Sequence, residues 1–360
     1  MILVAIENFV LLSTLLGCTS FVLAWSARRA SESGWWHPHP YTLTRLYALA
    51  LVVPPLVAAW LVAAALLPES WLGATTFEAA HPAPVHKWHL LGNLTATLEP
   101  VLAYATLVFA AAAVLLTVLL SVRGNLRVAR AIERLEMTAE PPPRDQLALV
   151  DRMAAQRGFR ADLVLSDYPF LFVWGFQRSW LVVSSGLLQA LTPEELAGAL
   201  EHEAAHHVRR DNLIKLILEF CGCVSLAFPL SWRLLRWRAE QIEMVCDEVA
   251  VARTSAPLEI AAALVKLRRL TLEPVGYWRT KTFTCSFVPE DAHSFERRVR
   301  RVIAFSDALP PASRARALLQ GHAGAALLVV GVFALTQTAV SAFAPLAVHQ
   351  ATEFLIRFFK

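Results

Sequence analysis

The stretch LEHEAAHHVRRD, residues 200–211, gathers metal-binding side chains in a chain that is otherwise mostly apolar. His202 and His206 are four positions apart, so in a helix both imidazoles project from one face and can share one ion. Glu203 stands beside the first histidine and completes H-E-x-x-H, a pattern in which two histidines bind zinc and the glutamate acts on the water that zinc holds. The stretch therefore predicts a Zn²⁺ site on a helix.

The surroundings of the motif predict that this helix is well started and follows short strands. Thr192 is the expected N-cap, with Pro193 at the first helical position and Glu195 at the third, which makes a capping box. Upstream, the runs ADLVLSD, FLFVWGF and SWLVVSS are rich in β-branched and aromatic residues, and they predict a small antiparallel sheet. Before them, DQLALVDRMAAQRG predicts an amphipathic helix that Gly158 closes.

A third metal ligand is expected on a later helix, because catalytic zinc generally takes three protein ligands and leaves the fourth position to water. The stretch AEQIEMVCDEVAVAR, residues 239–253, offers several acidic side chains. Glu243 and Asp247 share one helical face, so one can bind the metal while the other hydrogen-bonds a ligating histidine. Glu240 is a competing ligand that spacing alone does not exclude.

The composition indicates a membrane protein. The 360 residues are 56% hydrophobic and 17% charged, with a mean hydropathy of +0.48, whereas about a quarter of an ordinary soluble domain is charged. Four apolar stretches approach or exceed the ~20 residues that cross a bilayer; they are Phe9–Trp25, Leu43–Leu67, Val101–Val122 and Ala323–Val348. Five cysteines, most of them in or beside apolar runs, do not predict a disulfide scaffold.

Lysines and arginines set the predicted orientation, since they concentrate in cytoplasmic loops. Arg28, Arg29 and Arg45 flank the first loop, residues 68–100 hold the single Lys87, and the basic stretch RGNLRVARAIERLE follows the third apolar run. The N-terminus is therefore expected outside a bacterial inner membrane. The expected organisation is three transmembrane helices with short loops in 1–122, a cytoplasmic α+β domain in 123–322, a fourth transmembrane helix in 323–348 and a short periplasmic tail in 349–360.

A fifth apolar run, FCGCVSLAFPLSW at residues 220–232, is too short to cross a bilayer and has arginines on its far side. We expect a re-entrant or interfacial hairpin near 213–235, with both flanks in the cytoplasm.

A basic run, FERRVRRVIAF, closes the cytoplasmic segment. Its arginines, Arg297, Arg298, Arg300 and Arg301, suit the anionic inner leaflet, and because the run leads toward a span we expect lipid contact and no direct nucleic-acid binding.

The residues from LSDYPFLFVWGFQRSWLVVSSGLLQALTPEELAGALEHEAAHHVRRDN through EMVCDEVAVA resemble the integral-membrane zinc peptidases of the BlaR/MecR family, which are antibiotic-responsive sensor-transducers, and more distantly the Ste24/HtpX-like membrane metalloproteases. The resemblance covers roughly residues 100 to 305, and its two signatures, H-E-x-x-H and E-x-x-C-D, are specific together. It implies a multi-pass α-helical membrane protein with a cytoplasmic zincin (gluzincin) metalloprotease domain. It assigns His202, His206 and Glu243 as zinc ligands, Glu203 as the catalytic base, and Asp247 and Asp211 as supporting residues.

The same resemblance implies how substrates bind. The strand formed by Trp180, Leu181, Val182, Val183 and Ser184 looks like the edge strand to which the family's substrates add in extended form. The β-lactam sensors of the family carry a penicillin-binding domain after the last span, whereas here HQATEFLIRFFK follows it, so we expect no antibiotic sensing by that route.

The resemblance implies a membrane-embedded zinc metalloendopeptidase acting at the cytoplasmic membrane face. We expect a regulatory protease that cleaves a transcriptional repressor or itself. The candidate self-cleavage bond lies between Ser286 and Phe287, in the stretch VGYWRTKTFTCSFVPEDAHS at 275–294, which we expect to be extended and accessible. The competing interpretation of this stretch is an ordinary loop or a strand packed on the domain. Two alternatives stay open: a quality-control protease for membrane proteins, and a non-catalytic zinc-binding signalling scaffold in the membrane.

Overall fold

The computed structural model describes residues 2–66, 141–176, 179–224, 228–271, 285–286 and 292–306, together with parts of 104–130. The chain divides into two compact units. Unit 1 comprises Met1–Leu116, Glu219–Leu235 and Leu318–Lys360, and unit 2 comprises Thr117–Leu218 and Arg236–Ala317. The described residues are mostly helical, with one small sheet, which confirms the coarse fold class.

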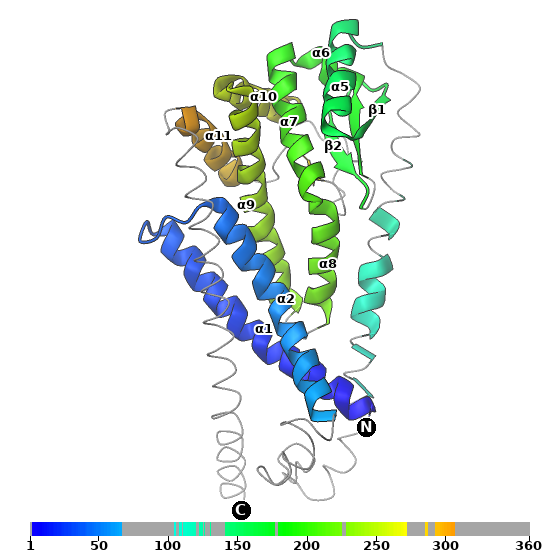
Figure 1. Cartoon of the computed structure of the whole chain (residues 1–360), viewed down its shortest axis with the longest axis vertical. Coiled ribbons are helices and arrows are strands. Elements are labelled where there is room, and N and C mark those ends of the chain that lie inside the picture. The colour runs from blue at the N-terminus through cyan, green and yellow to red at the C-terminus, as the bar shows by residue number, and fades with distance from the viewer. Residues whose placement is uncertain are drawn as a thin grey trace, which may run out of the picture. The chain divides into compact units, whose positions relative to one another are not determined.

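Two long helices of unit 1, α1 (Ile2–Glu32) and α2 (Pro40–Leu66), pack side by side (Figure 1). The first predicted span, Phe9–Trp25, lies within α1. The second, Leu43–Leu67, lies within α2 except for its last residue, Leu67, which is outside the described residues. Among the described residues, the stretch Pro40–Trp60 of α2 is long and apolar enough to cross a membrane, with a mean hydropathy of 1.6.

The other two predicted spans are described in part or not at all. Residues 111–119 of the third span are helical, but other parts of it lie outside the described residues. The fourth span, 323–348, and the tail, 349–360, lie wholly outside them. The multi-pass topology and its orientation therefore stay predictions.

The predicted hairpin near 213–235 is helical on both sides of its turn. Helix α8 (Asp211–Cys223) leads into it, and α9 (Phe228–Thr254) begins with Pro229 in its first turn, where proline is favoured. The two helices approach closely, because a Cβ added at Gly222 would lie 2.9 Å from the Cβ of Ser231. The depth of this hairpin in a membrane stays a prediction.

The sheet of unit 2 has four strands in the order β1-β3-β2-β4, namely β1 (Arg160–Val164), β3 (Trp180–Ser184), β2 (Leu171–Trp174) and β4 (Cys285–Ser286). Strand β3 pairs with β1 in parallel and with β2 antiparallel, and β2 also pairs antiparallel with β4. The sheet is therefore mixed, and the prediction of an antiparallel sheet was wrong in this respect.

The prediction that Trp180–Ser184 is an edge strand was also wrong, since β3 lies between β1 and β2. Its residues Leu181, Val182, Val183 and Ser184 are all buried, as is typical of a strand covered on both faces. The apolar run SWLVVSS lacks an alternating polar face for that reason.

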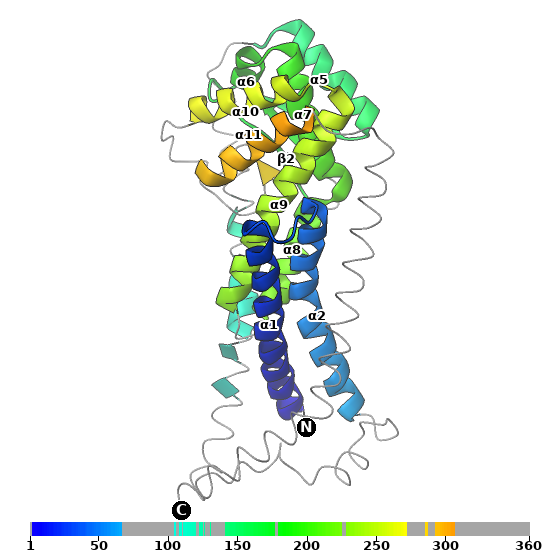
Figure 2. The same ribbon diagram turned by 90° about the vertical axis from the view of Figure 1, so that its left-hand side faces the viewer.

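Five helices of unit 2 share an apolar core with this sheet. They are α5 (Arg144–Arg157), α6 (Ser185–Ala190), α7 (Pro193–Arg209), α10 (Pro257–Thr271) and α11 (Ala292–Ser306) (Figure 2). Their shared apolar core includes Leu181, Val183, Leu196, Leu200, Ile260 and Leu264. The predicted start of α7 is confirmed, because Thr192 and Glu195 form a complete capping box. The predicted end of α5 is confirmed at Gly158, which has a left-handed φ of 71°.

Candidate metal centre

The two histidines of the motif lie one turn apart on the buried face of α7. The exposed fraction is 0% for His202 and 2% for His206. Their Nε2 atoms are 3.3 Å apart. The four-residue spacing has therefore placed both imidazoles on one face, as the sequence predicts.

Helix α9 supplies a third potential metal ligand beside the two histidines. One carboxylate oxygen of Glu243 lies 3.4 Å from His202 Nε2, and the other lies 3.6 Å from His206 Nε2. One potential ligand atom from each of these three residues lies within 4.8 Å of the others. The competing candidate, Glu240, instead forms an ion pair with Arg297 at 3.1 Å. The geometry thus favours Glu243 between the two alternatives.

A carboxylate holds the other ring nitrogen of each histidine. His202 Nδ1 lies 2.9 Å from an oxygen of Asp247, and His206 Nδ1 lies 2.9 Å from an oxygen of Asp211. Asp211 can contact His206, on the preceding helix, because Arg210 between α7 and α8 has a left-handed φ of 54° that turns the chain. Such partners fix the tautomer and the ring orientation, so both Nε2 atoms face the centre of the cluster.

Glu203 is fully buried next to the cluster. Its Oε2 accepts a hydrogen bond from the backbone N–H of Val173 at 3.1 Å, and its Oε1 has no hydrogen-bond partner among the described residues. Burial raises the pKa of Glu203 to about 7, although the nearby His206 and His202 oppose the rise. A carboxyl group with a pKa near neutrality can both accept and donate a proton.

The donor set fits a catalytic zinc ion. Two imidazole nitrogens and one carboxylate are the three protein ligands that catalytic zinc takes in several hydrolases, leaving one position open. The buried Oε1 of Glu203 needs a polar partner, which a water molecule at that open position would supply. The predicted ligands and base therefore occupy one chemically consistent site.

Comparison with known proteins places the residues of this centre within the matched range of one family. The profile of the family described as BlaR1 peptidase M56 matches residues 93–302. The chain belongs to this M56 peptidase family. The matched range holds all six predicted metal-site residues, and the family is one of membrane zinc metallopeptidases of the BlaR/HtpX type, so the resemblance read from the sequence is confirmed.

Curated relatives of the M56 domain are proteases named HtpX. The protease HtpX of Legionella pneumophila is 33% identical over 103 residues, covering 26% of this chain and 37% of that protein. A homologue from Acidiphilium cryptum is 34% identical over 157 residues, covering 34% of this chain and 55% of that protein. The protease HtpX homologue 1 of Streptomyces coelicolor is 25% identical over 157 residues, covering 33% of this chain and 52% of that protein. The chain spans about half the length of such relatives, or less.

Arg298 of α11 is a site residue that the sequence analysis missed. It is 0% exposed, and it donates to both oxygens of Asp247 from Nε and Nη2 at 2.7 and 2.8 Å. Its Nη1 lies 3.1 Å from Glu243. Burial raises the pKa of the Asp247 and Glu243 carboxyls, but the charge of Arg298 and the contacts with His202 together outweigh this effect and hold both pKa values below their usual range. Both carboxylates of this M56 centre are therefore ionised at neutral pH.

The expectation that the basic run of α11 faces the inner leaflet was wrong for Arg298, whose side chain is buried. Arg297 and Arg301 form ion pairs with Glu240 and Glu248 of α9, and Arg298 is buried. Arg300 pairs with a neighbour on its own helix and remains exposed. An arginine side chain normally contacts solvent or lipid headgroups, unless a buried acidic group forms an ion pair with it.

Asn212, in the first turn of α8, ties strand β2 to the centre. Its Nδ2 donates to the carbonyls of Val173 at 2.9 Å and Gly175 at 3.2 Å. Val173 is thus held through its N–H by Glu203 and through its carbonyl by Asn212. Strand β2 is therefore the strand that contacts Glu203, the predicted base, whereas the sequence analysis assigned substrate binding to Trp180–Ser184. Sequence spacing carried no signal for this contact.

Proposed function

We propose that this M56 family member is a zinc-dependent endopeptidase, with His202, His206 and Glu243 as metal ligands and Glu203 as the general base. The observation that carries the proposal is the approach of three ligand atoms to within 4.8 Å of one another beside the buried Glu203. Zinc held by three protein ligands supplies Lewis-acid chemistry, activating a water molecule and polarising a carbonyl group.

The protein residues supply proton transfer and alignment. Glu203, with a pKa of about 7, accepts the proton of the attacking water and later donates it to the leaving amine. Asp247 and Asp211 keep the Nδ1 atoms of the two histidines engaged, so the Nε2 atoms stay directed at the metal position.

The proposed substrate is an extended peptide that pairs with β2 in place of β4, on the side of β2 that faces away from β3. Strand β4 supports this mode, because it pairs antiparallel with β2 in the register Phe172 to Ser286 and Val173 to Cys285. The backbone N–H of Val173 is also the group that contacts Glu203, so a strand bound here lies beside the base.

The pairing of β4 also bears on self-cleavage. Residues 285–286, which include one side of the candidate bond between Ser286 and Phe287, lie along β2 as an extended segment, an arrangement that suits both a bound substrate and a strand packed on the domain. Phe287 itself is outside the described residues. We therefore propose a regulatory protease that cleaves itself, a cytoplasmic repressor, or both.

Quality control of membrane proteins is the second candidate, since the matched relatives are HtpX proteases with up to 34% identity over 157 residues. Accumulation of misfolded membrane proteins in a deletion strain would favour this role. Cleavage of one specific repressor after a stimulus would favour regulation. Signalling that survives Glu203→Gln would favour a non-catalytic scaffold.

The proposed location is a bacterial inner membrane, with the N-terminus outside and the peptidase domain in the cytoplasm. The apolar stretch Pro40–Trp60 and the family match support membrane attachment. The lipid bilayer is therefore a proposed partner.

The test uses the full chain purified in detergent, as wild type and as Glu203→Gln, each loaded with zinc. Wild type should cut an unfolded protein such as casein and should release a fragment of itself beginning at Phe287, found by N-terminal sequencing. Glu203→Gln should do neither, and chelation of zinc should stop both reactions. Equal cleavage by the two proteins would contradict the proposed function, whereas casein cleavage with an intact chain would remove only self-cleavage.

A further inference from the structure

An arginine from a distant helix reaches two different parts of the candidate metal centre. Arg298 lies on α11, and its side chain is fully buried among groups of α9. It contacts Asp247 through two nitrogens and Glu243 through the third. The buried guanidinium therefore contacts one candidate ligand, Glu243, and also Asp247, which contacts a second candidate ligand, His202.

We propose that Arg298 is a positioning residue that orients two of the three zinc ligands, Glu243 directly and His202 through Asp247. This inference rests on the proposed function, because it assumes that these residues hold zinc.

The path to His202 runs through one shared oxygen. Asp247 Oδ1 lies 2.8 Å from Arg298 Nη2 and 2.9 Å from His202 Nδ1, while Oδ2 accepts from Arg298 Nε at 2.7 Å. A two-point contact between a guanidinium and a carboxylate fixes the plane of the carboxylate. The direction of Oδ1, and with it the orientation of the His202 ring, is therefore set by Arg298.

The path to Glu243 is direct. Arg298 Nη1 lies 3.1 Å from Glu243 Oε2, the same oxygen that lies 3.4 Å from His202 Nε2. The other oxygen, Oε1, lies toward His206 Nε2 at 3.6 Å. Arg298 thus holds one side of the carboxylate while the other side faces the second histidine.

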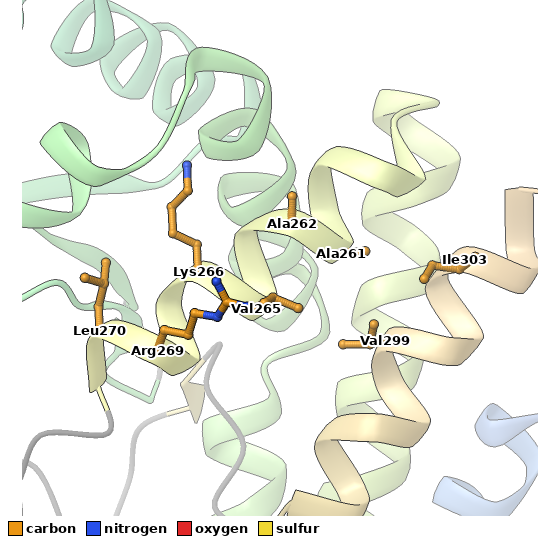
Figure 3. Close-up of a pocket in the computed structure, with 8 residues that line it drawn as sticks. All are labelled: Ala261, Ala262, Val265, Lys266, Arg269, Leu270, Val299 and Ile303. Atoms are coloured by element: carbon orange, nitrogen blue, oxygen red, sulfur yellow. The ribbon is translucent and has the colours of Figure 1, made fainter.

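Helix α11 is anchored well enough to carry this role. Toward α9 it forms the ion pairs Arg297–Glu240 and Arg301–Glu248. Toward α10 its buried Val302 belongs to the same apolar core as Ile260 and Leu264, and Val299 and Ile303 line a groove of about 500 Å³ beside it (Figure 3). Contacts on both sides restrict the backbone from which Arg298 extends.

A matched control exists on the same helix. Arg297 makes the same kind of ion pair with α9, but its partner Glu240 lies outside the candidate ligand set. Arg297→Met therefore removes an equal charge and one ion pair between the same two helices, from a less buried position, while leaving Asp247 and Glu243 untouched. Arg298→Lys keeps the charge but replaces the planar two-point contact by a single ammonium group.

The experiment measures zinc affinity of the full chain in detergent, by competition with a fluorescent zinc chelator. Arg298→Met should weaken zinc binding by about 10- to 100-fold, the usual effect of removing a group that orients a metal ligand. Arg298→Lys should recover little of this loss, and Arg297→Met should match wild type. With Co²⁺ in place of zinc, the visible absorption bands should change for both Arg298 variants only, because those bands report ligand geometry.

Thermal unfolding of the zinc-free proteins separates positioning from folding. If Arg298→Met does not fold, Arg298→Gln provides the same test with a polar side chain that carries no charge, and it should shift the Co²⁺ bands as well. Wild-type zinc affinity and unchanged Co²⁺ bands in Arg298→Met and Arg298→Lys would overturn the inference and leave the proposed function intact. A wild-type chain that binds no zinc would overturn both, and one that binds zinc without cleaving peptides would contradict the proposed function alone.

Discussion

Glu203 accepts a hydrogen bond at 3.1 Å from the backbone N–H of Val173, so the proposed general base is tied to strand β2. Glu203 comes from α7 and Val173 from β2, and their contact joins the proposed chemistry to the proposed peptide-binding strand. Because β4 pairs with β2 at the same residue, an extended segment and the base share one place in the fold.

Replacing Glu203 by Gln should abolish turnover while zinc stays bound. The amide keeps the size of the side chain but cannot accept the proton of the attacking water, and general-base catalysis contributes about 10²- to 10⁴-fold. The decrease should appear in kcat measured with an unfolded protein substrate. Glu194→Gln, at an exposed position of the same helix, should retain wild-type kcat. A Glu203→Gln protein with wild-type turnover contradicts the role of this residue.

Replacing Asn212 by Ala should loosen β2 and weaken peptide cleavage. The change removes two hydrogen bonds to the carbonyls of Val173 and Gly175. Each contributes about 0.5–1.5 kcal/mol, and about 1.4 kcal/mol corresponds to a tenfold effect. We expect kcat/KM to fall about tenfold, mostly through a higher KM, with zinc content unchanged.

Asn212→Asp keeps the shape of the side chain but cannot donate these bonds when ionised, so it should behave like Asn212→Ala. Wild-type KM in both variants would show that β2 does not bind the substrate.

Replacing Gly186 by Ala should destabilise unit 2. A Cβ at this position would overlap the backbone carbonyl of Asp167, which cannot move as a flexible side-chain end could. Overpacking of this kind costs about 1–3 kcal/mol. Thermal unfolding followed by tryptophan fluorescence should show a lower Tm. Gly158→Asn is the milder control, because a Cβ at Gly158 meets nothing within 4 Å and Asn tolerates its left-handed φ. A Tm unchanged by Gly186→Ala would contradict the close approach.

Reporter tags should reveal the predicted topology. Tags near residue 85 and at the C-terminus of this chain should report the outside, and tags near residues 160 and 238 the cytoplasm. The tag near 238 is the sharpest, because a hairpin that crossed the membrane would move it outside. An outside signal there would contradict the hairpin prediction and place Glu243 across the membrane from the histidines.

Local sequence signals predicted the elements around the motif correctly. The capping box of Thr192 and Glu195 and the one-turn spacing of His202 and His206 depend on neighbours within a few residues, so the sequence alone specifies them. The end of α5 at Gly158 is equally local.

Contacts between distant segments could not be predicted in this way. Strand β3 pairs in parallel with β1, and nothing in either run specifies that register, so the edge strand was assigned wrongly. The distinction between Glu243 and Glu240 depends on Arg297, more than fifty residues away along the chain. Arg298 was predicted to face the inner leaflet because it belongs to a basic run that leads toward a predicted span, and only the fold shows the two carboxylates that compensate its charge.

The most direct test of the central claim is the zinc content of the purified full chain, measured by mass spectrometry of the metal. The wild type and Glu203→Gln should each hold about one zinc ion per chain, since catalytic sites of this kind bind a single ion through three protein ligands. His202→Ala and Glu243→Ala should lose it, and Glu240→Ala should keep it. A wild-type chain without zinc, or a Glu243→Ala chain that keeps its zinc while Glu240→Ala loses it, would contradict the proposed site.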